Sequence, residues 1–229
     1  IWITNQTKKK ETIPMDIALS DDHRLIVISG PNAGGKSVTI KTLALNQYML
    51  QCGLLPCADA KSEFGFFKHL FVDIGDNQSI ENDLSSYSSH LTAMKYFLAK
   101  STPSTLLVID EIGSGTDPNF GGAMAEAILI HLNKKKPRGA VTTHFGNVKS
   151  LAKSEEGFIN ASMLYDTKLL KPLYKFEIGK PGSSFALEVA QNIGLPDFII
   201  KQARKRSNIK QQRTDELLAT LENERKELK

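Results

Sequence analysis

Gly30-Pro31-Asn32-Ala33-Gly34-Gly35-Lys36-Ser37 fits the phosphate-loop pattern, also called Walker A, of a glycine, four residues and then Gly-Lys-Ser. Residues 24–29 form an apolar run that predicts a strand buried on both faces, and residues 38–51 read as a helix. In such a loop, backbone N–H groups surround phosphate groups. Lys36 lies over the β- and γ-phosphates, and Ser37 offers its hydroxyl to Mg²⁺. The alternative, a chance glycine-rich turn, does not explain the order of strand, turn and helix.

A second motif, Thr105-Leu106-Leu107-Val108-Ile109-Asp110-Glu111, places two carboxylates at the end of an apolar strand, as in a Walker B motif. We expect Asp110 to hold the Mg²⁺ shell through water and Glu111 to polarise the attacking water. The alternative for either carboxylate is a helix cap or a salt-bridge partner. Together the two motifs indicate ATP hydrolysis or an ATP-driven switch.

Length and composition predict one large α/β domain with an appendage. The chain has 229 residues, of which 41% are hydrophobic, and a formal net charge of +4. This mild charge permits a nucleic-acid partner but fits an ordinary soluble surface equally well. Cys52 and Cys57 have no further cysteine to complete a metal site, so we interpret both as reduced thiols. No apolar run reaches a membrane span, which predicts a cytoplasmic protein without a membrane partner, and both ends suggest a fragment of a longer chain.

A polar, hydroxyl-rich segment, residues 76–90, follows a predicted strand over 69–74. It leads into a helical pattern that contains Leu91 and Met94, which places Ser85 or Ser86 at a helix N-terminus where N–H groups attract an anion. We interpret this segment as a phosphate sensor for a second subunit. A plain helix cap is the alternative.

A glycine-rich turn over residues 113–118 follows the acidic motif and precedes a predicted helix over 119–135. The next predicted strand, residues 139–144, ends in His144. A single histidine is often a structural residue, but this position fits a contact with the γ-phosphate of ATP. We therefore place His144 beside Glu111 as a catalytic residue.

The terminal regions are predicted from their extended and helical patterns. Residues 1–19 read as two extended stretches around a turn, where Trp2 or Ile13 is a weak candidate for packing on adenine and edge packing is the stronger interpretation. Two strands, then helices ending near 192 and 207, follow His144. We expect an ATPase core over 1–180, a helix-turn-helix appendage over 181–207 that packs or dimerises rather than reading DNA, and a charged linker helix over 208–229. The basic cluster within 201–206 fits a nucleic-acid patch or a solvated face.

These motifs together resemble the ATPase domain of the MutS family. The resemblance rests on the phosphate loop, on Gln78–His90, on Leu107–Pro118 and on Thr142-Thr143-His144. The variants Ser-Ser-Tyr-Ser-Ser-His and Gly-Thr-Asp-Pro resemble the bacterial paralogue group called MutS-two rather than the mismatch-repair branch.

The resemblance implies an ABC-type fold with a mostly parallel central sheet flanked by helices and a C-terminal helical dimerisation appendage. It implies a homodimer with two composite ATP sites, in which Gly35, Lys36 and Ser37 hold phosphate and Mg²⁺, Asp110 supports the metal, and Ser85 and Ser86 act on nucleotide bound by the partner subunit. The glutamine that senses phosphate in related ATPases has no counterpart in Pro56-Cys57-Ala58-Asp59.

For a full-length protein, the resemblance implies a DNA clamp before this domain and a small nuclease domain after it, so we expect no DNA cleavage by this chain. It suggests restraint of homologous recombination through branched DNA, or binding to stalled ribosomes, through domains outside the chain. Two alternatives stay open: a mismatch-repair MutS, and a nucleotide-gated scaffold in which hydrolysis is incidental.

Overall fold

A computed structural model describes residues 13–31, 34–75, 86–166, 171–182 and 186–206. Asn32, Ala33 and Ser85, which the sequence predicts to bind nucleotide, lie outside these ranges. The chain divides into two compact units, Ile1–Tyr165 with Pro172–Ser184 and Asp166–Lys171 with Phe185–Lys229, each considered separately below. The predicted division at residues 180 and 207 stays a prediction.

The first unit is built on a six-stranded sheet with the order β2-β3-β4-β1-β5-β6. Four neighbouring pairs, β2 with β3, β3 with β4, β4 with β1, and β1 with β5, are parallel. The predicted α/β fold with a mostly parallel sheet is therefore confirmed. The strands are β1 (His23–Ser29), β2 (His69–Asp73), β3 (Thr105–Ile109), β4 (Arg138–Thr142), β5 (Gly157–Asp166) and β6 (Lys171–Ile178).

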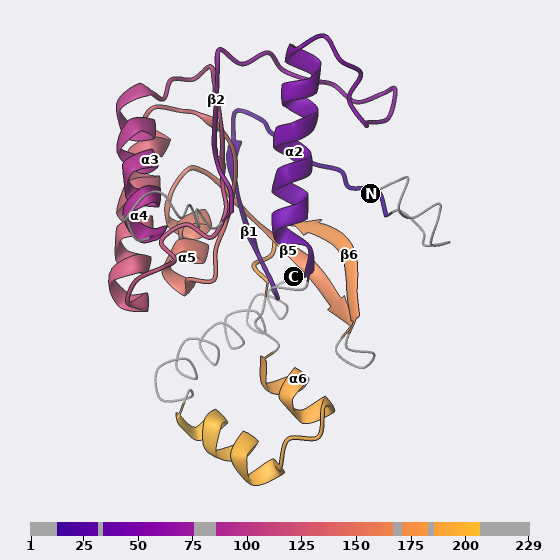
Figure 1. Cartoon of the computed structure of the whole chain (residues 1–229), viewed down its shortest axis with the longest axis vertical. Coiled ribbons are helices and arrows are strands. Elements are labelled where there is room, and N and C mark those ends of the chain that lie inside the picture. Colours follow the sequence, from indigo (N-terminus) through magenta and orange to yellow (C-terminus); the bar gives the residue numbers. More distant parts are fainter. Residues whose placement is uncertain (1–12, 32–33, 76–85, 167–170, 183–185, 207–229) are drawn as a thin grey trace, which may run out of the picture. The chain divides into compact units, whose positions relative to one another are not determined.

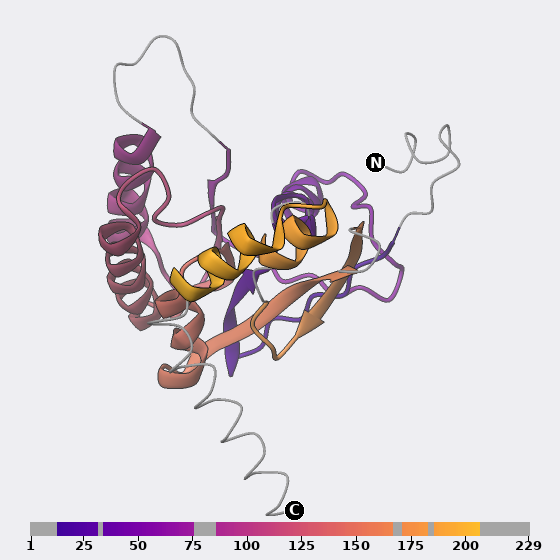
Figure 2. The same ribbon diagram turned by 90° about the horizontal axis from the view of Figure 1, so that it is seen from below.

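Helices cover both faces of this sheet. Figures 1 and 2 show α2 on one face and α3, α4 and α5 together on the other. Parallel strands require crossovers of this kind, and the apolar strands are consequently buried from both sides. The helices are α2 (Lys36–Gln51), α3 (Ser86–Lys100), α4 (Pro118–Lys134) and α5 (Gly146–Ser154).

Strand β1 shows how the sequence builds two cores. Its residues alternate between faces, so Leu25 and Val27 belong to the apolar cluster that includes α3, α4 and α5, whereas Ile26 and Ile28 belong to the cluster that includes α2. All four side chains are fully buried. The uninterrupted apolar run in the sequence is therefore the signature of a central strand between two helical layers.

The start of α4 is fixed by a side-chain cap. The Asp117 carboxylate accepts hydrogen bonds from the backbone N–H groups of Asn119 and Phe120, and Pro118 occupies the first helical position. Because the carboxylate also complements the helix dipole, the end of the glycine-rich turn is anchored beside the sheet.

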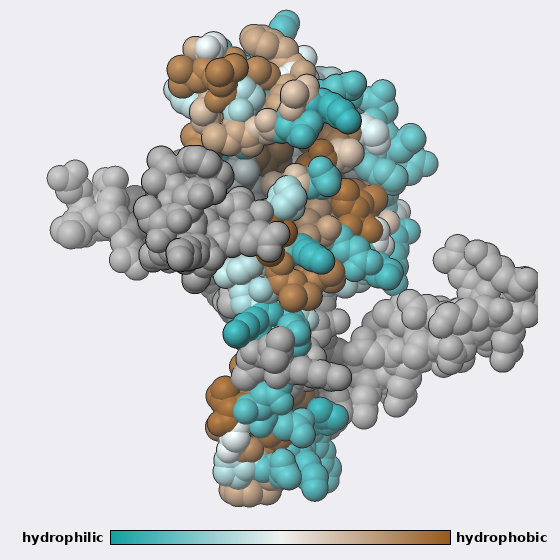
Figure 3. Space-filling model, turned by 90° about the vertical axis from the view of Figure 1, so that its right-hand side faces the viewer, coloured by the Kyte–Doolittle hydropathy of each residue, from teal (hydrophilic) through white to brown (hydrophobic). Residues whose placement is uncertain are grey.

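Apolar side chains remain exposed on the side of α2. Figure 3 shows brown apolar surface interspersed with hydrophilic surface on this face. Exposed apolar side chains of this size, when contiguous, are typical of interaction surfaces. Those on α2 and on the segment after it are Val38, Leu45, Tyr48, Leu54, Leu55 and Phe66.

One local prediction is wrong. Residues 13–20 carry no strand, although the sequence reads as an extended stretch of a hairpin. Pro14 lacks the N–H group that a strand ladder needs. Ile17 and Leu19 instead pack, partly buried, against the apolar cluster on the α2 side.

The second unit contains α6 (Ala186–Asn192) and a further helix over residues 197–206. The turn between them is closed by backbone hydrogen bonds from Ile193 to Val189 and from Leu195 to Ala190. The predicted pair of short helices is therefore present. Its role in dimerisation stays a prediction. Within the described residues, no helix combines the length and the apolar character needed to cross a bilayer.

Gly139, in the middle of the sheet, provides a test of the packing. A Cβ atom at Gly139 would lie 1.8 Å from the Leu107 carbonyl oxygen on β3. We therefore expect Gly139→Ala to force β3 and β4 apart and to lower the free energy of unfolding by about 2–3 kcal/mol, the upper range for overpacking. Chemical denaturation would measure this loss.

The matched control is Gly65→Ala, because a Cβ atom there meets only ordinary contacts with the Phe67 ring at 3.7 Å. Equal stability of the two variants would contradict the packing of β3 against β4.

Candidate nucleotide site

The carboxyl ends of three parallel strands meet at one edge of the sheet. In the register of the sheet, Ile28 of β1 lies beside Thr142 of β4, and Val141 of β4 lies beside Ile109 of β3. The loops after β1, β3 and β4 therefore emerge side by side. In open α/β sheets, ligands bind at this edge.

The phosphate loop holds its lysine in place. Lys36 is the first residue of α2, and its side chain is 2% exposed. Its Nζ donates hydrogen bonds to the carbonyl oxygens of Gly30 at 2.9 Å and Pro31 at 3.1 Å. Gly35 precedes the helix at a φ of +95°, which favours glycine, and so turns the chain sharply into α2. The loop thus wraps around a buried ammonium group.

Burial lowers the pKa of Lys36, because the charged form loses its hydration. The carboxylates of Glu111 and Asp110 oppose this shift, and the ammonium of Lys149 adds to it. A bound phosphate would favour the charged form that burial disfavours. The electrostatics of the loop therefore suit an anionic ligand.

Thr142 connects β4 to the acidic motif. Its hydroxyl donates a hydrogen bond to Oδ1 of Asp110 and accepts one from the backbone N–H of Glu111 at 2.7 Å. Asp110 is buried, and its own backbone N–H donates to the Asp73 carbonyl on the opposite side at 2.8 Å. Thr142 of β4 therefore orients the carboxylate of Asp110, and Asp73 of β2 anchors its backbone.

Glu111 and His144, the two residues that the sequence predicts to be catalytic, lie together, and their catalytic roles stay a prediction. Oε1 of Glu111 is 3.1 Å from Nε2 of His144, and both side chains are about two-fifths exposed, at 42% and 43%. Glu111 adopts a φ of +47°, an unfavourable conformation for a non-glycine residue that often marks a functional site. His144 follows β4 and is flanked by Thr143, whose hydroxyl accepts from the N–H of Phe145 at 3.0 Å. The pair thus combines access to solvent with a fixed backbone.

Two further residues pack on the phosphate loop, and sequence reasoning missed both. The side chain of Met163, on β5, would touch a Cβ atom placed at Gly34, at 3.1 Å. The ring of Tyr174, on β6, would lie 3.2 Å from a Cβ atom at Gly35. Tyr174 is 52% exposed and has a φ of +51°. An aromatic ring beside the loop is a feature that no local motif predicts, because β6 is far from the loop in sequence.

The donor set suits Mg²⁺ brought in with a phosphate ligand. Ser37 follows Lys36 on α2 and is half-buried, and Asp110 contributes one carboxylate. The described part of the chain contains no cluster of three or more His, Cys, Asp or Glu residues that could hold a metal ion by itself. Mg²⁺ typically takes one or two protein ligands, water and substrate phosphates, so these residues fit.

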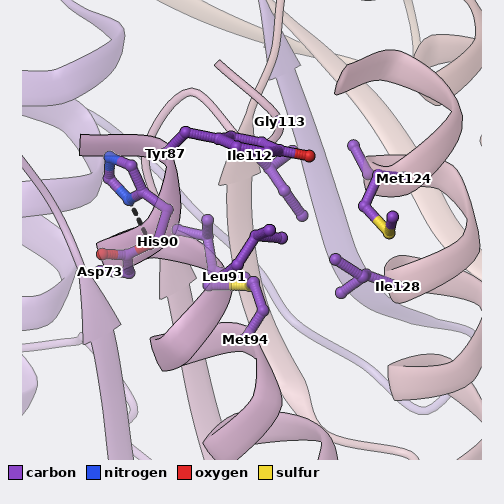
Figure 4. Close-up of a pocket in the computed structure, with 11 residues that line it drawn as sticks. Asp73, Tyr87, His90, Leu91, Met94, Ile112, Gly113, Met124 and Ile128 are labelled. Atoms are coloured by element: carbon purple, nitrogen blue, oxygen red, sulfur yellow. Dashed lines mark hydrogen bonds and ion pairs between the residues drawn. The ribbon is translucent and has the colours of Figure 1, made fainter. Parts of the chain in front are cut away.

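A second, less exposed pair lies beside the acidic motif. Nδ1 of His90, on α3, is 2.8 Å from Oδ2 of Asp73 at the end of β2. Figure 4 shows the pair at one side of an otherwise apolar pocket, with Tyr87 and Gly113 close by. The pair ties α3 to the sheet about one turn after Ser86, with which the helix begins.

Comparison with known proteins shows the family of the chain. The family model described as MutS domain V matches residues 26–210. "Endonuclease MutS2" of Lactiplantibacillus plantarum is 41% identical over 96% of this chain, and "Putative endonuclease MutS2" of Bacillus subtilis is 43% identical over 94%. "Endonuclease MutS2" of Pelotomaculum thermopropionicum is 42% identical over 95%.

The match spans nearly all of this chain but only 28% of the length of each of these relatives. Within that length lie the phosphate loop, the acidic motif and His144, which the fold brings to one edge of the sheet. The chain belongs to the MutS family, as an ATPase domain of the MutS2 type.

Proposed function

We propose that this chain binds and hydrolyses ATP with Mg²⁺ and that ATP binding pairs two copies of it. The observation that carries this proposal is the convergence of Lys36, Asp110 and the Glu111–His144 pair at the ends of neighbouring parallel strands. Membership of the MutS family supports the ATPase class.

The following roles are part of the proposal. The ammonium of Lys36 exchanges the carbonyl oxygens of Gly30 and Pro31 for phosphate oxygens. Glu111 accepts the proton of the attacking water. His144 contacts the Glu111 carboxylate through Nε2 in the free chain and would release it to donate this N–H toward the γ-phosphate. Water attacks phosphorus, the bond to ADP breaks, and inorganic phosphate leaves.

Ser37 and Asp110 would hold the metal ion, Asp110 through water. When bound, Mg²⁺ supplies positive charge to the phosphate oxygens. The hydrogen bond from Thr142 leaves the second carboxylate oxygen of Asp110 available for this role.

The second subunit would complete each site with Ser85 and Ser86, which precede or begin α3. In a longer protein, this ATP-dependent pairing would move a clamp on branched DNA or on stalled ribosomes. The relatives are named endonucleases. We assign no nuclease activity to this chain.

Glu111→Gln tests the mechanism. The amide keeps the size of the side chain but cannot accept the proton, so ATP should still bind while turnover falls about 10²–10⁴-fold, the usual contribution of a general base. Steady-state phosphate release, with ATP affinity measured separately, gives both quantities. Unchanged turnover would remove Glu111 from the mechanism.

A nucleotide-gated scaffold is separated from this proposal by Glu111→Gln and not by Lys36→Ala. Under either hypothesis, the Lys36→Ala variant should lose ATP binding and pairing. Only in the scaffold does Glu111→Gln leave the function of the intact protein unaffected. A mismatch-repair role would instead appear as a preference of the intact protein for mispaired over branched DNA.

Tyr174→Ala tests whether the ring beside Gly35 forms part of the nucleotide site. Because the ring is half-exposed and packs on the loop, we expect it to contact the nucleoside, and its loss should weaken ATP binding about tenfold, given that stacking contributes roughly 1–3 kcal/mol per base. Tyr174→Phe should bind as well as the wild type. Titration with a fluorescent ATP analogue compares the two, and equal affinity of Tyr174→Ala would exclude the contact.

A further inference from the structure

The chain that leaves β6 returns to the phosphate loop. The backbone N–H of Gly182 donates a hydrogen bond to Oγ of Ser29 at 2.7 Å. Ser29 ends β1, is fully buried and directly precedes Gly30, the first residue of the loop. Residue 182 is therefore joined to the point at which the loop begins, although the two lie far apart in sequence.

The backbone of Gly182 lies directly against the backbone of Ser29 and Gly30. A Cβ atom at Gly182 would lie 2.7 Å from both the carbonyl carbon and oxygen of Ser29, and 2.8 Å from the nitrogen of Gly30. A larger residue at position 182 fits only if one of these two backbone segments moves. This close packing, together with the Gly182–Ser29 hydrogen bond, links the backbone of Gly182 to the peptide between Ser29 and Gly30.

Lys149, on α5, holds Gly182 from the other side. Its Nζ donates to the Gly182 carbonyl oxygen at 3.0 Å. Burial lowers the pKa of Lys149, as expected of an ammonium group that has lost hydration. Its backbone carbonyl accepts a hydrogen bond from Nδ2 of Asn160, a buried residue of β5, at 2.9 Å. Lys149 is thus anchored to the sheet at its backbone and to Gly182 at its side chain.

We propose that Lys149 and Gly182 form a brace behind the phosphate loop, through which binding of the ATP phosphates is coupled to the helices of residues 186–206. This inference rests on the ATP binding proposed above. Lys149 acts through Gly182 and is therefore a positioning residue.

The coupling follows from the contacts of Lys36. When its ammonium turns toward a phosphate, it gives up hydrogen bonds to the carbonyl oxygens of Gly30 and Pro31, and the first peptides of the loop can then reorient. Gly182 packs against the peptide before Gly30 and begins the path to α6. By thermodynamic reciprocity, whatever holds those helices changes ATP affinity by the same factor as ATP changes their equilibrium.

The experiment uses the whole chain with Mg·ATP and compares wild type with Lys149→Met and Gly182→Ala. Lys149→Met keeps the apolar stem and removes the donor, whereas Gly182→Ala leaves all charges unchanged. Three quantities are measured: ATP affinity, kcat at saturation, and amide hydrogen exchange over residues 186–206. The controls are Lys153→Met, an exposed lysine of the same helix, and Gly146→Ala, where a Cβ atom meets open space.

In the wild type and both controls, ATP should alter exchange over 186–206. Each brace variant should lose that response at saturating ATP and bind ATP at least fivefold more weakly, with kcat within about twofold of the wild type. Because both substitutions break one connection, the double variant should bind ATP about as weakly as either single variant.

Three results would overturn the brace: a wild type that binds ATP without any change over 186–206, brace variants that keep the response, or losses of affinity that add fully in the double variant. If Gly182→Ala does not fold, Lys149→Met alone decides through the exchange response. A wild type that binds no ATP would overturn the proposed function itself, and the brace with it.

Discussion

The buried ammonium of Lys36 is the constraint on which the rest of the site depends. It loses hydration inside the phosphate loop, and loop carbonyls, the nearby carboxylates of Asp110 and Glu111, or a bound phosphate can compensate. The Lys36 ammonium can exchange the carbonyl oxygens of the loop for the oxygens of a phosphate. The loop can therefore report whether phosphate is present.

The sheet order makes that arrangement possible. Because β4 lies between β1 and β3, the Thr142 hydroxyl can bind both Asp110 and the backbone of Glu111, while His144, just beyond β4, reaches the carboxylate of Glu111. One strand end therefore orients both acidic side chains opposite the loop after β1. The brace at Gly182 fixes the same loop from behind, so the site is supported on two sides.

The features that could be predicted from the sequence are local ones. The apolar run before Gly30, the glycine pattern and the carboxylates after β3 each occupy adjacent positions, and parallel strands place their ends together. Three contacts could not be predicted, because they join residues distant in sequence and periodicity does not encode such contacts. They are Tyr174 with Gly35, Asp73 with His90, and Lys149 with Gly182. The extended pattern of residues 13–19 wrongly predicts a strand, because the side chains alone do not show whether a partner strand is present. Pro14 also lacks the backbone N–H that a strand would donate. Ser85, the predicted contact to a second subunit, lies outside the described residues and stays a prediction.

Pairing driven by ATP is the central claim, and the molar mass of the Glu111→Gln chain tests it most directly. Light scattering would compare this variant with and without Mg·ATP, and Lys36→Ala under the same conditions. The account predicts a doubling of mass for Glu111→Gln only when Mg·ATP is present, and none for Lys36→Ala. A single-chain mass for Glu111→Gln under both conditions, with ATP binding confirmed by titration, would contradict it.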